Sequence, residues 1–306
     1  MKKHAYLILV HNEPSIFETL ISLLDDERND IFVHVDKKTD ITQFQKIQSH
    51  YSNLIFIQER IDVRWGDISM MQAEMNLFKG ALRYASIVDG GGYDYYHLLS
   101  GVDLPIKTQN YIHYFFTEHK GKEFVSFIDN EKVSELIDFR MNYYHIFTNQ
   151  FRNKILLFRK GFSFFRLILF KCQKLLHMNR SHHQKYSIKY GSQWVSVTEN
   201  FVKYLVAQER QLLKRFKFTI IPDESFVQTV LYNSPFKKNI FKGLEPNETD
   251  FGNYNLREID FKRGNPWIWK EIDLEYLLAS NKFFARKFSS SEYNVVNKLL
   301  EHLKIK

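Results

Sequence analysis

Asp103 is the first residue whose type and position indicate chemistry. It follows an aromatic and apolar stretch, Tyr95–Leu99, and a break at Ser100-Gly101 where the backbone can turn sharply. Ligands of open α/β sheets bind outside the carboxyl ends of the strands, so a carboxylate at this point is a candidate site residue. The alternative is that Asp103 only caps a helix that begins near Gln109.

Two adjacent carboxylates in Pro222-Asp223-Glu224 form the second candidate. They lie between the apolar stretch Phe218–Ile221 and a segment with helical apolar spacing. Because a helix N-terminus favours negative charge, we expect Asp223 to cap the helix and Glu224 to point into a cleft as a general base. Alternatively, both carboxylates only complement the helix end.

Three further residues lie near predicted strand or helix ends. Asp36 follows the stretch Ile31–Val35, where a Rossmann-like sheet offers a carboxylate to a ribose, or it pairs with Lys37 or caps a helix. Arg64 and Trp65 precede a long helix, and Trp65 either stacks on a ligand or is a buried structural residue. No Gly-x-Gly-x-x-Gly follows the first strand, so a single nucleotide is favoured over a dinucleotide.

Basic residues close to apolar side chains characterise the end of the chain. Segments 255–267 and 281–288 combine Arg and Lys with Phe or Trp. Cations on hydrophobic anchors suit an anionic ligand, and the alternative is an ordinary docking segment.

These candidates require a sheet that brings strand ends together. Strands are predicted over Ala5–Val10, Ile31–Val35, Leu54–Ile57, Tyr95–Leu99, Phe124–Phe127, Tyr190–Val197 and Phe218–Ile221. Helices are predicted between them, among others over Thr42–His50, Met70–Ile87 and Glu199–Arg215. Successive β–α units favour a mostly parallel, Rossmann-like α/β sheet flanked by helices.

Composition narrows the class of protein. At 306 residues and 44% hydrophobic content, the chain can bury a sizeable core. Its single cysteine, Cys172, excludes an internal disulfide and a cysteine-based metal cluster and is typical of a reducing compartment. We find no secretory signal and no apolar run of the roughly 18 residues that span a membrane.

One segment accounts for the net charge of +8. Residues 151–190 hold ten Lys and Arg and no Asp or Glu, which leaves 33 basic and 35 acidic residues elsewhere, a net of −2. The near-neutral remainder argues against a protein that coats nucleic acid.

On a helix, the basic residues of 152–174 fall within an arc of roughly 140°, opposite most of the apolar ones. They are Arg152, Arg159, Lys160, Arg166, Lys171 and Lys174. The pattern favours a helix on an anionic membrane surface, and the alternative is a core helix with a solvated face, broken in two if Gly161 interrupts it.

Taken together, the motifs resemble the core-2/I-branching β-1,6-N-acetylglucosaminyltransferase family, which includes the peptide O-xylosyltransferases. The stretches that carry the resemblance are Leu7–His11, Ile31–Asp36, Trp65 with Ser69 and Ala73, Tyr95–Lys107, Gly191–Trp194, Pro222–Glu224, Leu256–Asp260 and Phe284–Phe288. They occur in one order and cover nearly the whole chain.

The resemblance implies a GT-A-type fold and an inverting transfer without a metal. Glu224 matches the family's catalytic base, and Arg257 and Lys287 match the basic pair that holds the donor diphosphate. The expected nucleotide and diphosphate contacts are Val10, His11, Asp36, Arg64, Arg257 and Lys287. The expected donor or acceptor sugar contacts are Asp103, Trp194, Arg140 and Trp65. Apart from the resemblance, Arg140 lies in a charged segment that can equally be a solvated surface.

The implied chemistry needs no cofactor. Most enzymes of this fold hold a divalent cation with Asp-x-Asp, whereas here Asp103 has Gly101 two residues before it. Two fixed cations can instead neutralise a leaving UDP. We expect a UDP-sugar donor, first UDP-GlcNAc for a β-1,6 linkage, and a glycan or lipid-linked acceptor. Gly191–Trp194 is closer to the xylosyltransferase branch, so UDP-xylose is the alternative donor.

The resemblance also bears on organisation and location. We expect a single domain, with a nucleotide-binding half over 1–130, a basic helical insert over 151–190 and an acceptor and catalytic half over 191–306. Animal members are Golgi enzymes with an N-terminal anchor and several disulfides, whereas this chain has a single cysteine. We therefore expect a bacterial, cytoplasmic member that is peripheral on the inner face of the plasma membrane through 152–174 and binds no nucleic acid. A non-catalytic basic membrane-binding module is the alternative of a different class.

Overall fold

A five-stranded sheet organises the computed structural model, which describes residues 2–89, 91–152, 155–178, 180, 186–243 and 254–304. Its order is β3-β2-β1-β4-β6. The strands are β1 (Lys3–Val10), β2 (Asn29–Val35), β3 (Asn53–Phe56), β4 (Tyr93–Ser100) and β6 (Ser196–Thr198). β1 pairs in parallel with β2 and β4, β2 pairs in parallel with β3, and β6 runs antiparallel to β4. The predicted, mostly parallel α/β sheet is confirmed.

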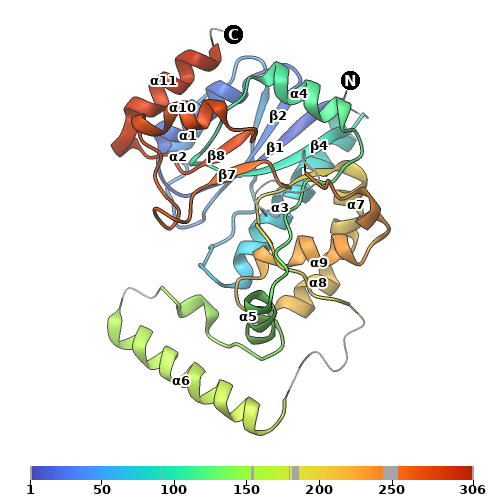
Figure 1. The fold of residues 1–306 in the computed structure, drawn as a ribbon, viewed down its shortest axis with the longest axis vertical. Coiled ribbons are helices and arrows are strands. Elements are labelled where there is room, and N and C mark those ends of the chain that lie inside the picture. Colours follow the sequence, from blue (N-terminus) through green and yellow to red (C-terminus); the bar gives the residue numbers. More distant parts are fainter. Residues whose placement is uncertain are drawn as a thin grey trace.

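Helices cover both faces of this sheet (Figure 1). They are α1 (Pro14–Leu24), α2 (Thr42–Gln45), α3 (Ile68–Tyr84), α4 (Gln109–Glu118), α5 (Glu131–Met141), α6 (Leu156–Leu175), α7 (Glu199–Ala207), α8 (Glu209–Phe216), α9 (Phe226–Tyr232), α10 (Leu274–Ala279) and α11 (Tyr293–Lys304). Tyr6, Ile8 and Val10 of β1 pack in a core with α1, α4, α10 and α11. Ala5 and Leu7 pack on the other face with α3, α7, α8 and α9. β1 is apolar throughout because both of its faces are covered.

A second, three-stranded sheet lies at the carboxyl end of β4. It consists of β5 (Asp103–Pro105), β8 (Phe284–Arg286) and β7 (Arg257–Ile259), in the order β5-β8-β7. β8 is antiparallel to β5, and the register places Arg286 directly opposite Asp103. The C-terminal part of the chain therefore brings its basic residues to the edge of the main sheet.

Some predicted elements differ from the structure. The predicted strands that are shortened or missing are Tyr190–Val197, Phe124–Phe127 and Phe218–Ile221. Phe124 pairs with Ser196 in an isolated bridge, and Ile221 has a φ of 53°, in the left-handed region. These apolar runs are buried by side-chain packing, which apolar patterning alone does not distinguish from strand pairing. α2 is also shorter than predicted, and the predicted helix Glu199–Arg215 divides at Gln208 into α7 and α8.

The basic insert contains α6, which runs unbroken through Gly161. Gln173 is the one buried residue of this helix, and many of its Phe, Leu and Ile side chains are exposed. The alternative of a core helix with a solvated face is therefore wrong. No helix in the described part of the chain is long and apolar enough to cross a membrane.

A close backbone approach explains why the chain is irregular before β6. The Gly191 N–H donates to the Glu224 carbonyl oxygen over 2.9 Å, and the Ser192 N–H donates to Ser126 Oγ over 3.0 Å. A Cβ at Gly191 would lie 1.9 Å from the Ser126 carbonyl oxygen. Glycine is thus required where the chain passes between Ser126 and Glu224.

We expect Gly191→Ala to lower the free energy of unfolding by about 1–3 kcal/mol, because the backbone must move to admit the methyl group. Urea denaturation measures this loss. The matched control is Gly161→Ala on α6, where a Cβ meets nothing within 4 Å and helix propensity favours alanine by up to about 1 kcal/mol. Equal midpoints for Gly191→Ala and the wild type would contradict the close approach.

Candidate active site

The carboxyl ends of β1, β2 and β4 meet at one edge of the main sheet. The Asp36 N–H donates to the Val10 carbonyl oxygen over 2.8 Å, and the Gly101 N–H donates to the Leu9 carbonyl oxygen over 2.9 Å. A Cβ at Gly101 would lie only 2.9 Å from Val10 Cγ2. The buried Val10 therefore holds the strand ends together, and the residues that follow the strands form the candidate site.

Asp36 is buried and carries a chain of ion pairs. Its carboxylate accepts from Lys38 Nζ at 2.8 Å, so the partner is Lys38 and not Lys37. Lys38 Nζ also contacts Asp62 at 2.7 Å, and Asp62 pairs with Arg64 at 2.7 Å. Arg64 is thus connected to Asp36 through two intervening charged groups, while its own side chain stays half exposed.

His11 lies among the charged groups of this edge. Desolvation lowers the pKa of His11, and the Asp36 carboxylate opposes this effect. The cations of Arg286, Lys38 and Arg152 lower the pKa of His11 further. Residues from β8, from the loop after β2 and from the start of the insert therefore surround His11.

Asp103 is a buried anchor for a cation. Its carboxylate accepts from the Ser100 N–H at 2.8 Å and from Arg286 Nη1 at 2.7 Å. The Arg286 guanidinium also lies over the ring of Trp194, 4.5 Å from the centroid. Thr108 caps α4, so the alternative that Asp103 is a helix cap is wrong. Asp103 does not point freely toward a sugar; it holds Arg286 in place.

Arg257 and Lys287, which the resemblance implies to be a pair that holds the donor diphosphate, lie in different surroundings. Arg257 is 3% exposed, and its guanidinium donates to the carbonyl oxygens of Asn255, Leu98 and Val195. Burial lowers the pKa of Arg257 to about 9. Arg257 therefore ties the second sheet to the first, and Lys287 is half-buried beside Arg286.

Trp65 lies on the surface, 44% exposed. The Arg152 guanidinium lies over its ring at 4.5 Å, and Phe151 packs edge-on against it. The alternative of a buried structural tryptophan is wrong. The ring connects the candidate site to the start of the basic insert.

Glu224 is oriented by two side chains from other elements. Its Oε2 accepts from Tyr190 Oη at 2.7 Å and from Arg140 Nη1 at 2.9 Å. Both bonds end on Oε2, and among the described residues we find no hydrogen bond to Oε1. The Glu224 side chain is 31% exposed, and that of Arg140 only 16%. Arg140 is thus a partner of Glu224 and not part of a solvated surface.

Asp223, next to Glu224, has the opposite environment. It is 1% exposed, and neither carboxylate oxygen has a hydrogen-bond partner among the described residues. Burial, with a contribution from the Glu224 charge, raises the pKa of Asp223 to about 8. The prediction that Asp223 caps a helix is wrong, because its carboxyl group points into the protein.

Glu74 of α3 forms the other part of this acidic interior. It is fully buried and accepts from Gln193 Nε2 at 3.2 Å. Burial and the Asp223 charge raise the pKa of Glu74 well above its usual value. Two carboxyl groups that favour the protonated form thus lie near Glu224.

One short segment joins the two halves of the site. Tyr190 binds Glu224 at its start, and Trp194 lies under Arg286 at its end. Four residue steps span at most roughly 14 Å. The segment therefore links the Glu224 carboxylate at one end to the fixed Arg286 guanidinium at the other.

The sequence did not single out Arg286, Tyr190 or Glu74 as site residues. In the sequence, Arg286 is one of several cations in segment 281–288. Tyr190 stands directly before the Gly191–Trp194 motif, and Glu74 is a charged residue on the core side of a helix with otherwise apolar spacing. These two positions were the available signals.

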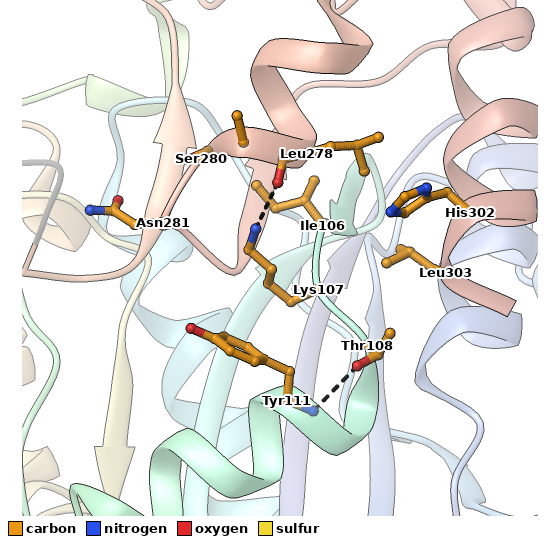
Figure 2. A pocket seen from close by; sticks show the side chains of 10 residues that line it. Ile106, Lys107, Thr108, Tyr111, Leu278, Ser280, Asn281, His302 and Leu303 are labelled. Carbon is orange, nitrogen blue, oxygen red and sulfur yellow. Dashed lines mark hydrogen bonds between the residues drawn. The ribbon is translucent and has the colours of Figure 1, made fainter. Parts of the chain in front are cut away.

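A separate cavity of about 430 Å³ lies between the start of α4, α10 and α11 (Figure 2). Lys107 reaches across it to donate to the Leu278 carbonyl oxygen at 2.9 Å, and Tyr111 and His302 line its sides. None of the described residues that line this cavity carries a carboxylate. The edge with Glu224 and Arg286 is therefore the better candidate for acid–base chemistry.

Comparison with known proteins identifies the family. The family model described as Branch: Core-2/I-Branching enzyme matches residues 4–243. The chain belongs to this family, as its motifs indicated.

The relatives include animal xylosyltransferases. Xylosyltransferase 2 of Rattus norvegicus is 24% identical over 319 residues, which cover 97% of this chain and 33% of that protein. Xylosyltransferase sqv-6 of Caenorhabditis elegans is 20% identical over 277 residues, which cover 85% of this chain and 31% of that protein. The chain spans about a third of the length of these relatives. A bacterial origin stays a prediction.

Solved structures of glycosyltransferases also match. The mannosyltransferase Ktr4p of S. cerevisiae matches with a TM-score of 0.32 and 11% identity over 75% of this chain and 65% of its own. Mouse xyloside xylosyltransferase 1 matches with a TM-score of 0.31 and 11% identity over 74% of this chain and 81% of its own.

The buried Asp223 predicts a pH-dependent stability. Its pKa of about 8 exceeds the usual value of about 3.9, so the folded protein keeps a proton that the unfolded chain releases. This contribution is complete below about pH 4 and is lost as the pH rises through about 8. We expect the melting temperature of the wild type to fall more between about pH 5 and about pH 9 than that of Asp223→Asn.

The control for this comparison is Asp129→Asn, at a carboxylate whose side chain is 77% exposed. This variant should follow the wild type at both pH values, because exposed ion pairs contribute little. Parallel pH profiles of Asp223→Asn and the wild type would show that Asp223 is ionised in the folded protein at neutral pH.

Proposed function

We propose that the protein is an inverting glycosyltransferase that transfers a sugar from a UDP-sugar to a hydroxyl group of a glycan or lipid-linked saccharide. The observation that supports it most is the placement of Glu224 and Arg286 at the two ends of Tyr190–Trp194. A base at one end can meet the acceptor, and a cation at the other can meet the donor diphosphate. Membership of the Core-2/I-Branching enzyme family favours this chemistry.

Glu224 is the general base of the proposed reaction. Oε1 takes the proton of the acceptor hydroxyl while that oxygen bonds to the anomeric carbon. The bond from the anomeric carbon to the UDP oxygen breaks, and its electron pair stays on the β-phosphate. Because attack and departure occur on opposite sides, the configuration inverts. Tyr190 and Arg140 bind Oε2, so they fix the carboxylate while Oε1 faces the acceptor.

Arg286 and Lys287 neutralise the departing diphosphate in this proposal. Arg286 takes the place of Arg257 as a diphosphate ligand in this proposal, because the Arg257 guanidinium is buried among backbone carbonyl oxygens. Asp103, which stands where most enzymes of this fold carry Asp-x-Asp, already pairs with Arg286. A guanidinium held by a buried carboxylate and an aromatic ring is preorganised for a phosphate. This arrangement supports a metal-independent transfer.

The donor sugar has two candidates. The resemblance of the motifs to the β-1,6-N-acetylglucosaminyltransferases favours UDP-GlcNAc, and the xylosyltransferase relatives favour UDP-xylose. Thermal shift and hydrolysis with a panel of UDP-sugars distinguish them, because the true donor should stabilise the protein beyond the effect of UDP alone.

Glu224→Gln should retain UDP binding and lose at least about 100-fold in transfer or hydrolysis rate, because an amide cannot take the proton. Isothermal titration with UDP and a UDP-release assay measure the two properties. The matched control, Glu118→Gln at an exposed position of α4, should behave as the wild type. Full activity in Glu224→Gln would remove Glu224 from the mechanism.

Arg286→Gln should weaken UDP binding by at least about tenfold, because a charge-assisted contact with the diphosphate is lost. The exposed Arg83→Gln serves as the control with the same charge change.

EDTA should leave transfer unchanged in the wild type. Loss of activity in EDTA with recovery on adding Mg²⁺ or Mn²⁺ would contradict the metal-independent mechanism.

A further inference from the structure

Helix α6 has three distinct sides, of which one faces the protein. The protein-facing side carries Phe162, Arg166, Leu169, Phe170 and Gln173, spaced by three or four residues as on one helix face. Phe170 packs against rings of α5 and the loop after it, and the Gln173 side chain bonds the backbone of that loop. This contact holds the helix by a narrow stripe.

The second side is apolar and faces solvent. Leu157 is 78% exposed, Phe164 is 66% exposed and Leu175 is 81% exposed, and Phe158, Phe165 and Ile168 extend the same surface. Leu176 and Met178 continue it beyond the helix end. Contiguous exposed apolar patches of this kind mark interaction sites in soluble proteins.

The third side is basic and adjoins the apolar one. Lys160, Lys171 and Lys174 lie within one quarter turn of each other at 100° per residue and are exposed. α6 contains no Asp or Glu that could pair with them. A second copy of the helix packed on the apolar side would bring these cations together with no acidic residue of α6 between them, whereas an anionic lipid surface would neutralise them.

The place of α6 in the molecule leaves both sides accessible. Figure 1 shows the helix at the outer edge, remote from the main sheet, with one end near α5. The bulk of the protein lies on the other side of α5 from α6. A flat surface can therefore approach the helix along its whole length.

We propose that α6 is a docking helix that lies in the plane of an anionic lipid bilayer. Its apolar side enters the boundary between headgroups and acyl chains, and Lys160, Lys171 and Lys174 contact the headgroup phosphates. This interaction does not depend on the proposed activity. Its consequence for the acceptor, that a lipid-linked saccharide is presented from the same surface, does rest on the proposed function.

The test uses the full chain and phosphatidylcholine vesicles with or without phosphatidylglycerol, in a flotation assay without donor or acceptor. The wild type should bind the phosphatidylglycerol vesicles and release them at high salt. The triple variant Lys160→Gln, Lys171→Gln and Lys174→Gln should lose on the order of 100-fold in affinity. The apolar variant Leu157→Gln, Phe164→Gln and Ile168→Gln should lose binding, with an unchanged melting curve because these side chains are exposed.

Controls with the same chemical changes elsewhere separate docking from general charge effects. Lys46→Gln, Lys238→Gln and Lys304→Gln remove three exposed lysines outside the insert, and Ile272→Gln changes an isoleucine that is 88% exposed. These variants should bind as the wild type, and so should Glu224→Gln, whose failure in transfer is a separate result.

Three outcomes would overturn the proposal. The first is absence of binding to either vesicle, and the second is equal binding to both. The third is a concentration-dependent dimer in sedimentation that the apolar variant abolishes while no vesicle binds, which would assign the surface to a second copy of the chain.

Discussion

The ion pair between Asp103 and Arg286 is the interaction on which the site depends. It joins β5 to β8, and through Ser100 it joins both to the end of β4. A buried carboxylate and guanidinium are costly to desolvate, and only complete hydrogen bonding offsets that cost. Asp103 obtains it from the N–H and hydroxyl of Ser100 as well as from Arg286, and the Trp194 ring covers the guanidinium. The pair therefore fixes a cation at the strand edge without the freedom of a surface lysine.

Adjacent residues in this fold acquire opposite acid–base character from their surroundings alone. Ile221 adopts a left-handed conformation and donates to the Gly66 carbonyl oxygen, which turns the chain before Pro222. The turn directs Asp223 into the interior, where burial favours its protonated form. Glu224 points outward to Tyr190 and Arg140 and keeps one oxygen free of partners within the described residues. The Asp223 carboxyl group is thus buried in a form that favours its proton, and the Glu224 carboxylate is available for acid–base chemistry.

The sequence predicted the parallel sheet because strands such as β1 and β2 are apolar on both faces and alternate with helices. It predicted the importance of Asp103 and Glu224 from their positions after buried segments. It did not predict the pairing of Asp103 with Arg286, since that contact joins residues 183 apart through the register of a three-residue strand. The burial of Arg257 was equally hidden, because motif matching gives a residue's position in the chain and not the side to which its guanidinium turns. The strand predicted over Phe218–Ile221 from its apolar, β-favouring residues is also absent, because these side chains are buried by tertiary packing without strand pairing.

The basic insert lies in the sequence between two residues that bind Glu224. The chain leaves the site at Arg140, forms α6, and returns at Tyr190, so the insert separates the two residues that bind Glu224 Oε2. Arg152 at its start lies on Trp65, whose neighbour Gly66 accepts from Ile221 just before the Pro222 turn. α6 is held to the rest of the protein by the same loop after α5. On the proposed function, an acceptor held near α6 would therefore approach Glu224 from the side of the residues that bind its Oε2, Arg140 and Tyr190.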